Sequence, residues 1–295
     1  MRVLIVNCTP SSAEAVHILA GGRSNEAHFA ESLRLHDARI ETTTVQAADD
    51  GLGAVGLPLS DFDGAILTGS PWGVYEDRRE IPDQIALARR LYEDGVPVFG
   101  SCYGLQLMAK ALGGDVHVNP RGREVGVARA ITLNEAGKAH AMLAGKPAVF
   151  DALCSHQDEV SRVPAGGVVL ASNDVSHVQA MTVDRGASSF WGVQYHPEFD
   201  FLTIASILER TSARNIAEGL ARDASEMAAV VADMRALSGR DGGRSIAWRM
   251  GLKPDVLDQR QRTAEFGAWL RQRVAPRVEV GETAVQLVAG LVGGG

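Results

Sequence analysis

The feature that most constrains the fold is a cysteine between a predicted strand and a predicted helix. The apolar run at residues 96–99 leads through Gly100 to Cys102, and the apolar spacing of residues 105–112 predicts a helix that begins at once. Glycines at positions 100 and 104 suit a nucleophile held on a tight turn, where bulkier neighbours would clash. A helix N-terminus also favours the thiolate. Since most lone cysteines are small buried hydrophobes, both interpretations of Cys102 stay open here.

Strands and helices alternate along the first part of the chain. The predicted strands and helices cover residues 2–6, 26–35, 39–45, 64–67, 81–92 and 96–99. This alternation predicts βαβ units and a mainly parallel sheet. Ligand sites in such sheets lie beyond the carboxyl ends of the strands, where the loops at Gly69 and Cys102 fall.

The pattern changes twice after residue 115. Short alternating runs separated by Gly, Pro, Asn and Asp predict antiparallel strands added to the sheet, at residues 125–133, 148–154, 168–172, 178–183 and 190–193. From residue 201 the chain becomes rich in helix formers, with helices predicted over 201–237 and 257–274 and a polar break at 240–244. We expect one domain over residues 1–205 and a helical C-terminal extension over 206–295, with a partly disordered tail from residue 278.

A second cluster of chemistry-bearing residues follows the strand that ends at Val193. Residues 194–198 read Gln-Tyr-His-Pro-Glu, and side chains two apart in extended backbone point the same way. His196 can therefore act as a base toward the Cys102 thiol, with Glu198 orienting the imidazole. An isolated His-Pro-Glu is otherwise typical of a surface turn, and these residues alone leave that alternative open.

Composition narrows the functional classes. The 295-residue chain is 45% hydrophobic and 22% charged, as in an ordinary soluble globular protein, and its net charge of −7 argues against nucleic-acid binding. No apolar run is long enough for a membrane span. The three cysteines are widely spaced and odd in number, which suggests a reducing, cytoplasmic compartment. Without a CxxC or HExxH motif, we expect no metal and no cofactor.

Three motifs together resemble those of a known family. Residues 100–106 match the G-x-C-x-G-x-Q turn of the class I, triad-type glutamine amidotransferases, and residues 194–198 match their Q-[FY]-H-P-E motif. Residues 155–158, Ser-His-Gln-Asp, resemble a segment of the branch formed by the amidotransferase domain of GMP synthase and related stand-alone proteins. The resemblance spans about residues 1–210. It implies an α/β, flavodoxin-like three-layer sandwich with a mainly parallel central sheet, additional antiparallel strands and a C-terminal helical extension.

The same resemblance implies a catalytic triad. Cys102 would attack the side-chain amide of glutamine and form a γ-glutamyl thioester. His196 would carry protons to the leaving ammonia and from the attacking water, while Glu198 holds His196. Tetrahedral intermediates of acyl transfer need such an arrangement together with donors for their negative charge.

Oxyanion-hole and substrate contacts are implied in the same way. The oxyanion hole would use backbone N–H groups of Tyr103 and of the loop at Gly69 and Ser70. Ser70 is a departure, because the synthetase-linked enzymes usually have two adjacent glycines there. Gln106 would contact the substrate, and the backbone at Ser155 and His156 would hold the amino-acid end of glutamine. For the His156 ring we expect a structural hydrogen-bonding role.

Three functions remain compatible with these motifs. The leading hypothesis is a glutaminase that supplies ammonia from L-glutamine to a separate synthetase subunit. The second is a γ-glutamyl peptidase or hydrolase that acts on γ-glutamyl compounds with the same triad. The third is a non-catalytic binding protein on the same fold, which the intact Cys102, His196 and Glu198 disfavour. The C-terminal extension could serve as a lid, a homodimer surface or a partner-docking element, although an amphipathic helical extension is most often simply packed. For the chain as a whole we expect neither a nucleic-acid nor a membrane partner.

Overall fold

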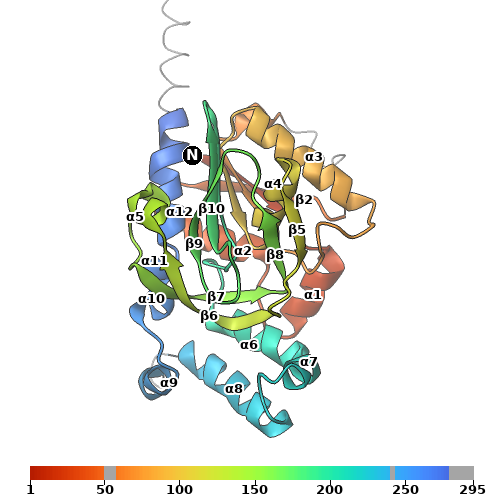
Figure 1. The fold of residues 1–295 in the computed structure, drawn as a ribbon, viewed down its shortest axis with the longest axis vertical. Coiled ribbons are helices and arrows are strands. Elements are labelled where there is room, and N and C mark those ends of the chain that lie inside the picture. The colour runs from red at the N-terminus through yellow and green to blue at the C-terminus, as the bar shows by residue number, and fades with distance from the viewer. Residues whose placement is uncertain (50–57, 240–242, 279–295) are drawn as a thin grey trace, which may run out of the picture.

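The computed structural model describes residues 1–49, 58–239 and 243–278, and a nine-stranded mixed sheet lies at its centre (Figure 1). In sheet order the strands are β2 (Glu41–Gln46), β1 (Arg2–Asn7), β3 (Gly64–Leu67), β4 (Val98–Ser101), β11 (Ser188–Val193), β10 (Ala180–Arg185), β9 (Gly167–Ser172), β6 (Glu124–Leu133) and β7 (Val149–His156). The strands from β2 to β11 pair in parallel, and those from β11 to β7 pair antiparallel. The predicted parallel core with added antiparallel strands is confirmed.

The parallel strands are buried on both faces, which explains their nearly continuous apolar sequences. In β1, Leu4 and Val6 point to the face covered by α3 (Glu80–Glu93) and α4 (Tyr103–Ala111). Val3 and Ile5 point to the opposite face, which is covered by α2 (Asn25–Arg34), α12 (Ala264–Trp269) and the π-helical turn η4 (Leu270–Val274). Helices therefore cover both faces of the sheet, giving three layers.

Side-chain caps fix where several helices begin. The side chains of Ser24, Asp200 and Asp223 accept hydrogen bonds from backbone N–H groups in the first turns of α2, α6 (Phe201–Arg210) and α8 (Ala224–Leu237). Such caps satisfy N–H groups that have no partner within the helix, and each typically contributes about 1 kcal/mol.

Some elements differ from the sequence-based expectations. The run at 190–193 lies in β11, which pairs antiparallel with β10 but also in parallel with β4. A helix that was not predicted, α1 (Ser11–Leu19), follows β1. A two-stranded sheet of β5 (Asp115–Val118) and β8 (Asp158–Arg162) was not predicted, because its short strands carry few apolar residues.

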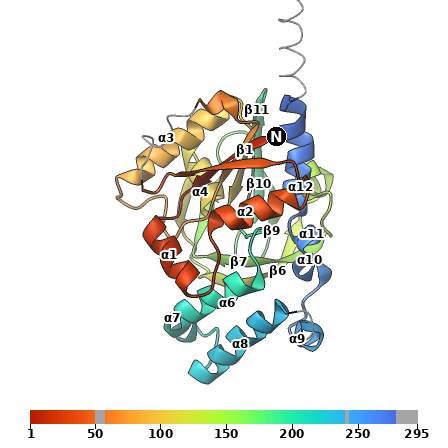
Figure 2. The same ribbon diagram turned by 180° about the vertical axis from the view of Figure 1, so that it is seen from behind.

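The helical region after residue 201 is more divided than its sequence suggests. The stretch 201–237 forms α6, α7 (Ser212–Ala217) and α8, and Gly219 with φ of +80° allows the turn between α7 and α8. The remaining elements are α5 (Glu135–Ala139), α9 (Gly243–Arg249), α10 (Pro254–Leu257), α11 (Gln259–Arg262) and the 3-10 turns η2 (Leu59–Asp61) and η3 (Ala141–Leu143). In Figures 1 and 2, α7, α8 and α9 form the lower end of the molecule.

The last described helix packs against the central sheet. Phe266 and Trp269 of α12 are fully buried, and the Phe266 ring meets the Phe99 ring of β4 edge-on at 4.9 Å. Glu265 forms an ion pair of 3.2 Å with Lys146, both side chains being almost completely buried, and also accepts a hydrogen bond from the Tyr195 hydroxyl. The second helical layer is therefore drawn from both ends of the chain, while the division at residue 205 stays a prediction.

Among the residues that the structure describes, none of the helices combines the length and the apolar character needed to cross a membrane. The expectation of a partly disordered tail concerns residues 279–295 almost entirely, which lie outside the described residues, as do positions 240–242 of the predicted polar break.

Candidate active site

Three loops meet at one edge of the sheet because they follow neighbouring parallel strands. Strand β3 leads to Gly69, β4 to Cys102 and β11 to His196, and β4 lies between the other two. Val193 of β11 is paired with Ser101 of β4, so the segments that follow these two strands start side by side. Residues almost a hundred positions apart thus converge at the edge where parallel sheets bind ligands.

The turn at Cys102 is tight and strained. Cys102 has φ of 52° and ψ of −105°, a conformation that costs a non-glycine residue about 1–3 kcal/mol. A Cβ at Gly104 would lie 2.1 Å from the Leu67 carbonyl oxygen, and one at Gly100 would lie 2.6 Å from the backbone of Gly104. The Cys102 N–H donates to the Val193 carbonyl at 2.8 Å, which ties the turn to β11. The predicted need for glycine at 100 and 104 is confirmed.

His196 is held in a buried array. Its Nδ1 lies 2.7 Å from Oε1 of Glu198, and the Ser101 hydroxyl lies 3.0 Å from both carboxylate oxygens of Glu198. The imidazole stacks on the Phe199 ring with a centroid distance of 3.8 Å and an interplanar angle of 2°. These contacts fix the ring's orientation and direct Nδ1 to Glu198, leaving Nε2 for the side of Cys102.

The charge state of His196 is set by two opposing influences. Burial disfavours the imidazolium and lowers the pKa of His196. The Glu198 carboxylate raises this pKa, and so do the charge of Cys102 and the hydrogen bond between His196 and Cys102. The result is a pKa of about 10 for His196. His196 is therefore an imidazolium at neutral pH. This is the charge state that a group needs if it is to protonate a leaving nitrogen.

One amide side chain and one backbone carbonyl contact the Cys102 sulfur, and a second amide holds the first in place. The thiol donates to the Ser155 carbonyl at 3.8 Å, and the Gln194 amide donates to Sγ at 3.5 Å. Gln106 in turn donates to the Gln194 carbonyl oxygen and to the Asp158 backbone carbonyl, both at 3.1 Å. The Gln106 amide nitrogen is thus committed to protein contacts, and its side chain also lines the cavity in front of Cys102.

The predicted oxyanion-hole residues flank the thiol. Gly69 packs against His196, since a Cβ there would lie 2.9 Å from Cε1 of the imidazole. Ser70 lines the cavity, and its hydroxyl accepts from the Trp72 N–H at 3.3 Å. The Tyr103 side chain points away to Gln84, so only its backbone N–H, at the start of α4, is available to the site.

His156 lies in the cavity wall with both ring nitrogens near acceptors. Its Nε2 is 2.9 Å from Glu124 and its Nδ1 is 3.2 Å from the Asp158 carbonyl. Asn173 and Gln179 also donate to Glu124, at 2.7 and 2.8 Å. These contacts fit the structural hydrogen-bonding role expected for His156.

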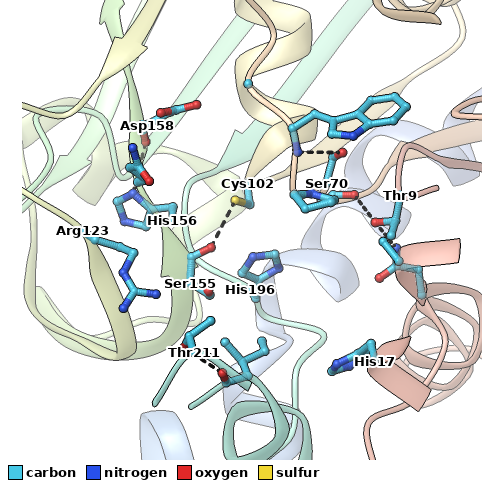
Figure 3. Close-up of a pocket in the computed structure, with 18 of the residues that line it drawn as sticks. Thr9, His17, Ser70, Cys102, Arg123, Ser155, His156, Asp158, His196 and Thr211 are labelled. Carbon is cyan, nitrogen blue, oxygen red and sulfur yellow. Dashed lines mark hydrogen bonds between the residues drawn. The ribbon is translucent and has the colours of Figure 1, made fainter. Parts of the chain in front are cut away.

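A cavity of about 390 Å³ opens in front of the Cys102 sulfur (Figure 3). Asp158, His156 and Arg123 lie on one side of Cys102 in Figure 3, and Ser70, Thr9 and His17 lie on the other. Burial raises the pKa of Asp158, despite a hydrogen bond from the Tyr75 hydroxyl that lowers it. Burial also lowers the pKa of His17 to about 4, so that ring is neutral at physiological pH.

Several residues of the site were not predicted. Ser101 and Gln194 lie inside the quoted motifs, and Phe199 follows one of them, but their contacts depend on the pairing of β4 with β11. Thr9 carries no motif. Cys8 is fully buried, and burial raises its pKa to about 12. No group of three or more His, Cys, Asp or Glu side chains in the described part of the chain could hold a metal ion.

Comparison with known proteins identifies the family. Residues 21–209 match the model of the family described as glutamine amidotransferase class-I. The chain is 35% identical over 221 residues to gamma-glutamyl-L-1-hydroxyisopropylamide hydrolase of a Pseudomonas species, covering 74% of each protein. It is 38% identical over 189 residues to GMP synthase [glutamine-hydrolyzing] of Streptomyces coelicolor, covering 60% of this chain but only 34% of that one. The chain belongs to the class I glutamine amidotransferases and is an enzyme of this type.

Solved structures agree on the fold. A glutamine amidotransferase from Thermotoga maritima aligns with a TM-score of 0.62 at 16% identity, covering 93% of this chain and 98% of that one. One from Methylobacillus flagellatus aligns with a TM-score of 0.60 at 21% identity, covering 92% and 96%. At these identities the likeness concerns the fold, including the C-terminal helical region.

Proposed function

We propose that this chain hydrolyses γ-glutamyl amides whose leaving group is an organic amine, using Cys102, His196 and Glu198 as its catalytic triad. The observation that carries the proposal is the 390 Å³ cavity, which has walls on both sides of the Cys102 sulfur. The part of the cavity on one side of the sulfur is enough to hold the glutamyl group of the substrate. The part on the other side can hold an organic amine, whereas ammonia as the only leaving group would need no such space.

The proposed chemistry follows from the geometry. The Cys102 thiolate attacks the γ-carbonyl carbon, and the negative charge on the oxygen is taken up by the N–H groups of Ser70 and Tyr103. The C–N bond then breaks as His196 protonates the departing nitrogen, which leaves a γ-glutamyl thioester. A water molecule, deprotonated by the now neutral His196, attacks the thioester, releasing glutamate and restoring the Cys102 thiolate.

The two sides of the cavity suggest how the substrate lies. We place the glutamyl end along β7 and β8, near Gln106 and the backbone of Ser155 and His156. The Asp158 carboxylate on this side offers a partner for the α-ammonium group. The amine would then leave toward the side formed by Thr9 and His17.

The pattern of relatives also supports this proposal. The similarity to the Pseudomonas hydrolase extends over about three quarters of both chains, beyond the matched amidotransferase region. The GMP synthases favour a second candidate, a glutaminase that delivers ammonia to a separate synthetase, but this chain spans about a third of the first of them. Both candidate functions proceed through the same acyl-enzyme and differ in the leaving group, which is an organic amine in one and ammonia in the other.

A substrate panel tests the proposal. We expect kcat/KM for γ-glutamyl alkylamides, such as γ-glutamyl isopropylamide, to exceed that for L-glutamine by about tenfold or more, because an apolar amine gains contacts that ammonia lacks. Release of glutamate and amine is measured with the purified chain alone. The matched control is the β-aspartyl isopropylamide, whose shorter acyl chain should be a poor substrate. Preference for free glutamine would favour the glutaminase, and no release from any γ-glutamyl amide would contradict both.

The pKa of His196 predicts the alkaline side of the pH profile. Because its pKa is raised to about 10, the imidazolium and its pairing with Glu198 are present at neutral pH and are lost as the pH rises through about 10. We expect kcat/KM to fall over the same range. The Glu198→Gln variant removes the charge that raises this pKa, so its residual activity should fall at lower pH. An alkaline limb that does not move in this variant would contradict the assigned role of Glu198.

A further inference from the structure

The loop after β3 is fixed by a hydrogen bond that the catalytic steps above do not use. The Gly69 carbonyl oxygen accepts from the Thr9 hydroxyl at 2.8 Å and also lies 3.0 Å from the Thr68 hydroxyl. The Thr9 bond is the long-range one, because Thr9 follows β1 whereas the loop follows β3. It therefore connects two neighbouring strand ends at the edge of the site.

This bond sets the direction of a neighbouring N–H group. The described residues contain no cis peptide bond, and in a planar trans peptide the C=O of Gly69 and the N–H of Ser70 point in opposite directions. In Figure 3, Thr9 lies on the side of Ser70 that faces away from Cys102. A Gly69 carbonyl held toward Thr9 thus aims the Ser70 N–H toward the Cys102 side, where the oxyanion forms.

The Thr9 hydroxyl has a single proton, and its surroundings determine where that proton goes. The Asn25 side-chain amide donates to the Thr9 oxygen at 2.9 Å, so the hydroxyl proton is left for Gly69. Asn25 is itself fixed, since its side chain also donates to Asn7 at 2.9 Å and its backbone N–H donates to Glu14 at 2.7 Å. The network of Asn25 and Asn7 therefore fixes the direction in which the Thr9 hydroxyl donates its hydrogen bond.

We propose that Thr9 is a positioning residue for the oxyanion hole, acting through Gly69 to hold the Ser70 N–H on the developing charge. The proposal rests on the proposed function, because it assigns Ser70 the role of oxyanion donor. It also accounts for serine at position 70. The donor there is the backbone, and the Ser70 side chain is occupied with the Trp72 N–H.

Loss of the Thr9 hydroxyl should weaken stabilisation of the transition state and leave substrate binding nearly unchanged. Without the Thr9 proton the Gly69 carbonyl keeps only its bond from the adjacent Thr68 hydroxyl, so the peptide between Gly69 and Ser70 is held less firmly and the donor is misdirected rather than removed. Complete removal of one oxyanion donor typically costs 10²–10³-fold in kcat. We therefore expect a loss of about 10- to 100-fold in kcat with little change in KM.

The test compares Thr9→Val, which keeps the branched shape but lacks the hydroxyl, with Thr9→Ser, which keeps the hydroxyl. Both are assayed on the best γ-glutamyl amide, and binding is measured for a γ-glutamyl aldehyde, which forms a tetrahedral adduct with a thiolate. In Thr9→Val, kcat should fall about 10- to 100-fold and aldehyde affinity by a similar factor, with KM within about twofold. Thr9→Ser should recover most of both.

Other outcomes overturn the proposal in distinguishable ways. If Thr9→Val matches the wild type, or raises KM with kcat unchanged, Thr9 does not position the oxyanion donor. Equal losses in Thr9→Val and Thr9→Ser would also overturn it. Thermal unfolding identifies a variant that has lost its fold, in which case Thr9→Ala, which cannot introduce a clash, gives the same comparison. If the wild type hydrolyses no γ-glutamyl amide, the proposed function itself fails, and the assigned role of Thr9 fails with it.

Discussion

Replacing Cys102 with alanine is expected to lower kcat/KM for γ-glutamyl amides by at least about 10⁴-fold, because no other group can form the thioester. The substitution keeps a Cβ in the strained turn, so the fold should be retained. The measurement is amine release, together with labelling by an electrophilic glutamine analogue followed by mass spectrometry. Wild-type protein should carry one label, on Cys102, and the variant none.

The matched control for this prediction is Cys8→Ala. Cys8 is another buried free cysteine, but burial raises its pKa to about 12, and its thiol donates to the Val6 carbonyl instead of facing the cavity. The Cys8 variant should keep its activity and its single label. Near-normal hydrolysis by Cys102→Ala, or labelling of another cysteine in wild-type protein, would show that the nucleophile has been misassigned.

Replacing Lys146 with methionine is expected to lower the free energy of unfolding by about 3–5 kcal/mol. The substitution leaves the Glu265 carboxylate buried and without its cation, and both side chains are almost completely shielded from water. Adding Glu265→Gln to the Lys146 variant should restore part of the loss, because the uncompensated charge is then gone. Urea unfolding of the three proteins, followed by circular dichroism, gives the comparison.

Lys138→Met provides the control, because it makes the same substitution in an exposed pair. Lys138 bonds Glu135 on the surface, and exposed pairs contribute little. Its unfolding midpoint should stay close to that of the wild type. If Lys146→Met were no more destabilising than Lys138→Met, the buried pair would not be what secures α12. The Lys146 variant should also lose activity, since Tyr195, which donates to Glu265, directly precedes His196.

The sequence predicts those features of this molecule that depend on residues close together in the chain. Gly100 and Gly104 flank Cys102 because the backbone there leaves no room for a Cβ, and a pattern of that kind is visible in a single sequence. The His196 and Glu198 pair is likewise local. The class of enzyme followed from combining these two motifs, and the comparisons confirm it.

What the sequence could not predict depends on contacts between distant segments. Thr9 looks like an ordinary turn residue until β1 and β3 pair and bring it to Gly69. Lys146 lies between a glycine and a proline, as a surface lysine would, and only the packing of α12 buries it against Glu265. Gln194 reaches the Cys102 sulfur because β11 turned out to be a parallel neighbour of β4.

The position of α12 has a consequence for how the chain folds as it is synthesised. Ile5, Ile66 and Phe99 belong to the strands that are made first, yet Phe266 and Trp269, which cover the same face, are made long after them. Until then, this face of the growing chain exposes an apolar surface of the kind that promotes aggregation. The cover of this face is therefore completed only after the α12 segment has left the ribosome, and until then the nascent chain is open to aggregation there.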